Sequence, residues 1–385
     1  MTVLYRTMNL KSKFTTKNVL TISGIYVLIL LCLEFAGHFT IKYIESRRPS
    51  GIYAENIMSL HEPVLDFALK KKVDENFPGW NVKTNVLGYR IGQDFELEKP
   101  KDTLRIVLMG GSTIFGWGVG SEDSIPVLLQ KLITDEIAKS GRSIANLPKK
   151  VEVINAGVPW YTTWNEAALT VHRVMMLKPD WVIAFDGLND AAKSLAPEWK
   201  PIYKGYEDVA TTLVRERLEH KVTLKDFLLE VANLSPTVRY LYAKLHAKKE
   251  MQMGAYHPEV WDQYVYYHEI VKALCDGKGV RYSAFLQPVM MVHKPLHEQE
   301  LKTNFTSMRD DKIAQTFKKV YLIGEAALEK ASFKITNLAA VFENTKDVIY
   351  LDGLHYNRLG NMMLAEAIFN NEVKPKLSTM MNAGL

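Results

Sequence analysis

The chain lacks most features of a disulfide-linked, zinc-binding or nucleic-acid-binding protein. Its 385 residues include only two cysteines. Cys32 lies in an apolar run and Cys275 in a predicted helix, so we expect no disulfide between them. No Cys-x-x-Cys pair or cysteine–histidine cluster is present, so the sequence predicts no zinc site. The net charge is only +5 and basic residues form no concentrated patch, so nucleic acid is not an expected partner.

The sequence also lacks internal repeats and low-complexity tracts, which argues against a solenoid or a largely disordered chain. Hydrophobic residues make up 47% and charged residues 24%, an ordinary composition for a globular protein. The length suits one large domain with attachments, or two smaller domains.

A long apolar run lies near the amino terminus. Residues 1–18 are polar, contain four basic residues and no acidic residue, and are predicted to form a cytoplasmic tail. Residues 19–40 are mostly apolar and match the thickness of a bilayer core, with Glu34 near the far end. We therefore expect a single-pass transmembrane signal anchor in the cytoplasmic membrane, with the main domain outside the cytoplasm, in the periplasm. A cleaved signal peptide and a buried helix are the alternatives.

The remaining chain divides into a connecting segment and one regular domain. Residues 41–100 are rich in turn formers and are predicted to be a stalk followed by an irregular cover. The turn at residues 85–90 should pack against the next domain. Residues 101–375 are predicted to form that domain, interrupted at about 191–259 by a helical insertion. The insertion either shapes a substrate pocket or is an appendage without a role in the site.

Apolar strands alternate with helices through this domain. Strands are expected at residues 104–109, 151–155, 181–185 and 282–286, followed by a short apolar run at 348–351. Helices are expected at residues 124–139, 163–177, 260–276, 312–331 and 357–370. This alternation predicts an α/β fold with a parallel sheet and right-handed crossovers.

Functional groups follow the ends of these strands, where open α/β sheets place their sites. Ser112 comes after the first strand, in Gly110-Gly111-Ser112. It is either a helix cap in a glycine turn or a nucleophile that needs a neighbouring base. His355 is a candidate base, and Asp352 is placed to orient its imidazole.

The same strand ends offer donors for a developing oxyanion. The candidates are the backbone N–H groups of Ser112 and Gly157 and the side-chain amide of Asn189. Glycine at position 157 allows a close approach of the backbone.

Taken together, four segments resemble the SGNH hydrolase superfamily, also called GDSL esterases and lipases, in its membrane-attached bacterial form. They are Gly110-Gly111-Ser112, Asn155-Ala156-Gly157, Gly187-Leu188-Asn189-Asp190 and Asp352-Gly353-Leu354-His355. The resemblance implies a flavodoxin-like three-layer α/β/α sandwich and acyl-ester chemistry without a metal or organic cofactor. Two positions depart from the family pattern, since Gly111 stands where aspartate is usual and Tyr356 where proline is common.

The resulting hypothesis is a serine esterase that hydrolyses acyl esters, O-acetyl or short acyl, of a carbohydrate or lipid. An O-acyltransferase acting on a cell-envelope polysaccharide would use the same residues. A non-catalytic cell-envelope scaffold is the alternative of another class.

Several other residues near the strand ends have competing interpretations. Asp190 is interpreted as a helix cap, and Asp186 and Arg90 as supports of the site. The segment 293–297, which contains two histidines, is interpreted as a solvated loop. Three aromatic residues in the loops after the first two strands either contact an acyl or sugar group or serve packing: Trp117, Trp160 and Tyr161.

Overall fold

The computed structural model describes most of the chain, in two compact units. The described residues are 16–45, 57–62, 65–77, 79–92, 94–139, 148–195, 235, 237, 256–290, 292–302 and 311–382. One unit comprises residues 1–51 and 210–251, and the other comprises residues 52–209 and 252–385. Most of the predicted insertion at 191–259 and most of the predicted cytoplasmic tail lie outside the described residues.

The described part of the first unit is chiefly one long helix, α1 (Thr16–Glu45), which contains the predicted membrane span. Glu34 on this helix accepts a hydrogen bond from the hydroxyl of Ser235 at 2.7 Å, within the same unit. Among the helices that the structure describes, none is both long enough and apolar enough to cross a membrane. The predicted span at residues 19–40 is helical in the structure, and its placement in a membrane stays a prediction.

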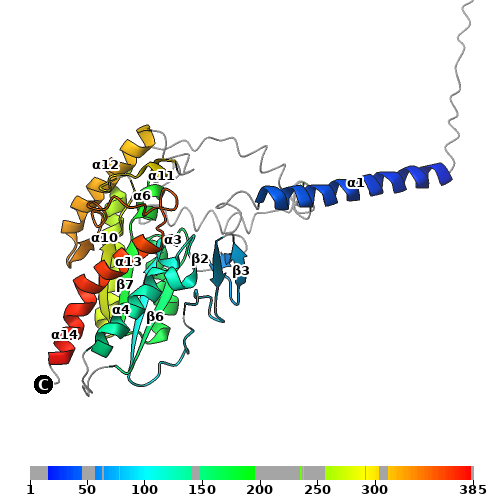
Figure 1. Cartoon of the computed structure of the whole chain (residues 1–385). Coiled ribbons are helices and arrows are strands. Elements are labelled where there is room, and N and C mark those ends of the chain that lie inside the picture. Colours follow the sequence, from blue (N-terminus) through cyan, green and yellow to red (C-terminus); the bar gives the residue numbers. More distant parts are fainter. Residues whose placement is uncertain are drawn as a thin grey trace, which may run out of the picture. The chain divides into compact units, whose positions relative to one another are not determined.

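The second unit contains a five-stranded parallel sheet (Figure 1). Its order is β6-β5-β7-β8-β9, so β5, the first strand of this sheet in chain order, lies second from the edge. The strands are β5 (Thr103–Gly110), β6 (Lys150–Gly157), β7 (Trp181–Asp186), β8 (Arg281–Leu286) and β9 (Ile335–Asn337). Counted from β5, this is the 2-1-3-4-5 order of flavodoxin-like folds. The central strands consist of apolar residues, as expected for a parallel sheet that is covered on both faces.

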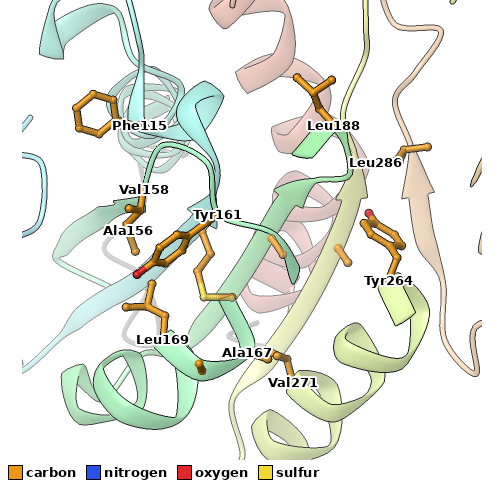
Figure 2. Close-up of a cluster of buried hydrophobic side chains, with 14 of the residues drawn as sticks. Phe115, Ala156, Val158, Tyr161, Ala167, Leu169, Leu188, Tyr264, Val271 and Leu286 are labelled. Carbon is orange, nitrogen blue, oxygen red and sulfur yellow. The ribbon is translucent and has the colours of Figure 1, made fainter. Parts of the chain in front are cut away.

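Helices cover both faces, which gives the predicted α/β/α layers. One face carries Ile106 and Leu108 of β5 into a core shared with α4 (Ile125–Lys139), α13 (Arg358–Ile368) and α14 (Lys374–Asn382). The other face carries Val107 and Met109 into a core shared with α5 (Thr163–Leu169), α10 (Glu259–Gly277) and α12 (Asp311–Ala327). Figure 2 shows part of this second core, where Tyr161 lies beside Val158 and Leu169.

Several expected elements of the domain differ from the structure. The last strand is β9, which was not predicted, because three residues are too short to show a period. The run at 348–351 is not a strand of the sheet; it makes one bridge, between Tyr350 and Tyr356. The helix predicted at 163–177 ends as α5 and continues in π and 3-10 turns, η2 (Thr170–Val174) and η3 (Met175–Leu177). The closing helix α13 leads into α14, which runs beyond residue 375.

The cover segment is more regular than expected. It contains two antiparallel hairpins, β1 (Met58–Glu62) with β2 (Asp66–Leu69), and β3 (Asp74–Phe77) with β4 (Trp80–Lys83). Ile57 and Val82 of this segment are fully buried in the core that contains α5 and α10. The prediction of an irregular cover was wrong because these hairpins are stabilised by packing on the domain, which the sequence pattern alone does not reveal.

Candidate active site

Ser112 begins a single helical turn at the carboxyl end of β5. This turn, α3 (Ser112–Phe115), is closed by hydrogen bonds from Phe115 N to Gly111 O and from Gly116 N to Ser112 O, both 3.0 Å. Gly116 ends the turn with φ of 87°, a left-handed conformation that favours glycine. Ser112 is half-buried, and its N–H has no protein acceptor within the described residues because it is the first of the turn.

The structure brings Ser112, His355 and Asp352 into one continuous contact. His355 Nε2 lies 2.7 Å from Ser112 Oγ, and His355 Nδ1 lies 2.7 Å from Asp352 Oδ2. Ser112 and His355 are 243 residues apart in the chain. The imidazole is largely covered, with 12% of the His355 side chain exposed. The geometry is that of a nucleophile beside a base that a carboxylate orients.

Asp352 is held as an ionised acceptor. Its Oδ1 accepts hydrogen bonds from the backbone N–H groups of Leu354 and His355, both at 2.8 Å. Burial alone would raise the pKa of Asp352, but the imidazole of His355 and these N–H groups outweigh burial and lower it. An ionised carboxylate can only accept, so Nδ1 of His355 carries a hydrogen and Nε2 is left to accept from Ser112.

Asn189 lies beside the backbone that precedes the serine. Its Nδ2 donates to the carbonyl of Tyr161 at 2.8 Å, which uses one of the two amide hydrogens. A Cβ added to Gly111 would lie 2.5 Å from this Nδ2. The amide therefore occupies the space that any larger side chain at position 111 would need. This contact gives a physical reason for glycine at position 111.

Gly157 contributes to the site in a different way from the prediction. Its N–H, expected to bind an oxyanion, donates to Asn155 Oδ1 at 3.0 Å. The side-chain amide of Asn155 in turn donates to the carbonyls of Ile114 and Phe115 at 3.0 and 3.2 Å. A Cβ at position 157 would lie only 2.3 Å from Phe115 N, so the close backbone approach expected at this glycine is present. Of the three predicted oxyanion donors, Ser112 N–H and the second hydrogen of Asn189 Nδ2 therefore stay candidates.

Arg90 fastens the loop that follows the serine. Its guanidinium donates to the carbonyls of Phe115, Gly116 and Val119 at 2.5 to 2.7 Å, and to Asn81 at 2.8 Å. Burial lowers the pKa of Arg90 to about 9, so the group stays charged at neutral pH. Its expected supporting position is thus present as four charge-assisted hydrogen bonds to backbone oxygens.

A buried ion pair supports the loop that carries His355. Lys294 Nζ lies 2.7 Å from Glu300 Oε2, and both side chains are almost fully covered. Glu300 Oε1 accepts from the backbone N–H groups of Ile349 and Tyr350 at 2.8 and 3.1 Å, just before Asp352. Burial opposes ionisation of Glu300, but these donors lower its pKa. The interpretation of segment 293–297 as a solvated loop was wrong for Lys294, because Glu300 supplies it with a buried partner.

Three buried carboxyl groups lie behind the loop that carries Asn189. Glu166, Asp186 and Asp190 are each at most 5% exposed. Burial, followed by the charge and hydrogen bond of Asp186, raises the pKa of Glu166 well above its ordinary value. The raised pKa favours the protonated form of Glu166, which reduces the repulsion between two buried carboxyl groups. Asp186 ends β7 three residues before Asn189, so this pair fixes the start of the loop.

Asp190 and His268 connect these carboxyl groups to neighbouring helices. Asp190 Oδ1 accepts from the N–H and hydroxyl of Thr163, at 3.2 and 2.7 Å, and so holds the first residue of α5. Burial and the charge of Asp186 raise the pKa of Asp190 to about 6. His268 on α10 lies 3.3 Å from Asp186 Oδ1 and 2.6 Å from the hydroxyl of Tyr282. The prediction that Asp190 caps the helix after it was wrong, because Asp190 lies within α6 (Leu188–Lys193) and binds the first residue of α5 instead. No sequence signal indicated Glu166 or His268.

Among the aromatic candidates, Trp117 stacks near His355, with ring centroids 6.0 Å apart and an interplanar angle of 28°. Tyr161 is fully buried and donates its hydroxyl to the carbonyl of Phe67 at 2.7 Å. These two residues serve packing around the site. In the part of the chain that the structure describes, no group of three or more His, Cys, Asp or Glu side chains is arranged to hold a metal ion.

Comparison with known proteins gives weak structural likenesses. No family model and no curated protein sequence matches the chain. A GDSL-like lipase from Bacteroides thetaiotaomicron is 12% identical, covers 72% of this chain and 90% of its own, and has a TM-score of 0.35. A catalytic mutant of an acetylxylan esterase from Geobacillus stearothermophilus is 15% identical, covers 69% and 92%, and has a TM-score of 0.36. Likenesses at this level carry no inference about activity.

Proposed function

We propose that this chain is a serine esterase of the SGNH hydrolase type, acting on acyl esters of a carbohydrate or lipid. The observation that carries the proposal is the continuous relay from Ser112 Oγ through the imidazole of His355 to Asp352, with 2.7 Å at each step. A serine helix cap needs neither an imidazole nor a carboxylate behind it. A nucleophile needs both, because its hydroxyl is weakly reactive without a base.

The reaction follows from the positions of these atoms. Ser112 Oγ attacks the ester carbonyl carbon while His355 Nε2 takes the hydroxyl proton. The oxyanion that forms accepts hydrogen bonds from Ser112 N–H and Asn189 Nδ2, and ionised Asp352 stabilises the charged imidazole. Collapse of the intermediate breaks the bond to the alcohol, which takes the proton from Nε2. Water then attacks the acyl-enzyme by the same route and releases the acid and the free serine.

The proposal is tested by covalent labelling and turnover. A fluorophosphonate probe should label the wild-type protein, and Ser112→Ala should abolish both labelling and hydrolysis of p-nitrophenyl acetate. Ser378→Ala is a matched control, because that hydroxyl is exposed on α14 and bonded only to the carbonyl of Lys374. An unlabelled wild-type protein with no turnover would favour a non-catalytic scaffold. Adding a glycan acceptor separates transfer of the acyl group from its hydrolysis.

The cellular location stays a prediction from the amino-terminal charge and hydropathy pattern. A carboxyl-terminal reporter that is active only outside the cytoplasm tests it in intact cells. Activity of a reporter that works only inside the cytoplasm would contradict the predicted periplasmic placement.

A further inference from the structure

The loop after β6 contains a tight turn with an unusual residue in it. Tyr161 N donates to the carbonyl of Val158 at 3.2 Å, which closes a four-residue turn with Pro159 and Trp160 at its centre. Trp160 has φ of 71°. Proline followed by a residue with positive φ is the pattern of a type II turn, in which the second central position normally holds glycine. A bulky side chain in this conformation is strained.

The side chain of Trp160 is also poorly covered. It is 61% exposed, whereas its neighbours Pro159 and Tyr161 are buried. Glycine at this position would remove both the backbone strain and the exposed apolar surface. The indole therefore has no evident benefit for the fold, and strain kept at one position of this kind points to a role outside the fold.

Both ends of the turn are fastened to backbone that flanks Ser112. Val158 N donates to Gly110 O at 3.0 Å, two residues before the serine. The carbonyl of Tyr161 receives the amide of Asn189 and lies 3.6 Å from the position of a Cβ on Gly111. The turn that carries Trp160 is therefore held at the same sheet edge as Ser112.

We propose that Trp160 is a stacking platform for a pyranose ring of an O-acylated carbohydrate whose ester Ser112 attacks, an inference that rests on the proposed esterase function. An indole face is negative at its centre and attracts the polarised C–H groups on one face of a pyranose. The other face and the hydroxyl groups of the sugar stay in water. A half-exposed ring suits such a ligand, whereas an acyl chain needs apolar surface on all sides to leave water.

The test compares Trp160→Gly with Trp160→Phe and a matched control. O-acetylated xylo-oligosaccharides and p-nitrophenyl acetate serve as the two substrates. Trp160→Gly should lower the ratio of kcat/KM for the oligosaccharide to kcat/KM for p-nitrophenyl acetate about tenfold or more, mainly through KM, and should raise Tm because the strain is gone. Trp160→Phe should keep part of the ratio. Lys72→Gly replaces another exposed residue with positive φ, 56°, and should leave the ratio unchanged.

If Trp160→Gly leaves the ratio of kcat/KM for the oligosaccharide to kcat/KM for p-nitrophenyl acetate unchanged, Trp160 is not a sugar platform. A selective loss of p-nitrophenyl octanoate hydrolysis would also contradict the proposal, because it would assign the indole to an acyl chain. A second measurement does not depend on turnover. Ser112→Ala should bind the O-acetylated oligosaccharide in calorimetry, and Ser112→Ala/Trp160→Gly should bind it at least about tenfold more weakly. Equal affinities would reject the platform, whereas weakened binding without any wild-type turnover would reject only the esterase.

Discussion

The closest backbone contact of the site gives the sharpest prediction, the effect of Gly157→Ala. An added Cβ would lie 2.3 Å from Phe115 N and 2.7 Å from Ile114 C, both main-chain atoms that cannot rotate away. Ordinary contact begins at 3.4 Å, so β6 and the turn α3 must separate by about 1.1 Å. Phe115 N is bonded to Gly111 O, and Ser112 lies in the same turn, so the serine moves with it.

The magnitude follows from the distance between nucleophile and base. A displacement of about 1 Å directly away from His355 takes Ser112 Oγ from 2.7 Å to about 3.7 Å from Nε2, beyond hydrogen-bond reach, and a sideways displacement misaligns the bond. A misplacement of that size typically costs about 100-fold in rate. Overpacking at a covered position also destabilises, by about 1–3 kcal/mol. We therefore expect kcat/KM for p-nitrophenyl acetate to fall about 100-fold and Tm to fall by several degrees.

The assay separates misplacement from unfolding. Rates are measured well below the Tm of each variant, and circular dichroism verifies that the protein is folded. Gly277→Ala is the matched control, because a Cβ at that glycine, the last residue of α10, meets nothing within 4 Å. It should retain full activity and gain slightly in stability. If Gly157→Ala stays within threefold of the wild-type rate, the close approach of β6 does not position the serine and this reasoning is wrong.

Two further predictions concern the carboxyl groups. Asp352→Asn should lower kcat by about 10³ to 10⁴, with Tm little changed. The asparagine amide can donate to His355 Nδ1 and so favours the tautomer in which Nε2 carries the hydrogen and cannot accept from Ser112. A loss of less than tenfold in an esterase assay would show that Asp352 does not orient His355. Asp190 holds its proton up to about pH 6 when folded and to about 3.8 when unfolded, so its contribution to stability is full below about pH 4 and is lost as the pH rises to about 6. Asp190→Asn should flatten this part of the stability profile, measured as Tm between pH 4 and 7, and a slope equal to that of the wild type would contradict the assignment.

The sequence alone was sufficient for the four longer strands of the sheet, for most of its covering helices, and for naming the three residues that lie in contact as Ser112, His355 and Asp352. Apolar runs of the central strands are long enough to show their period, and the α/β alternation then fixes where their carboxyl ends meet. Ser112, Asn189, Asp352 and His355 could be named because each follows such a strand or lies in a compact loop. A chain pattern predicts which residues share an edge of a sheet, since parallel strands end on the same side.

Local pattern could not predict the short or packing-dependent elements. The strand β9 has three residues, and the hairpins of the cover are stabilised by contacts with the domain. The supports of the site were equally hidden. Glu300 lies about 50 residues before the backbone groups it binds, and Glu166 meets Asp186 only because α5 packs against the sheet. Neither glutamate has a local sequence signal, because a charged residue normally indicates solvent.

The tertiary structure also decided which hydrogen bonds each predicted donor makes. Gly157 was correctly predicted as a point of close approach, but only the coordinates show that its N–H is engaged by Asn155 and that Asn189 Nδ2 fills the space beside Gly111. Residue type and spacing along the chain specify which chemical groups are available at a strand end. The partners of those groups depend on distances between distant segments, and these distances exist only after the chain has folded.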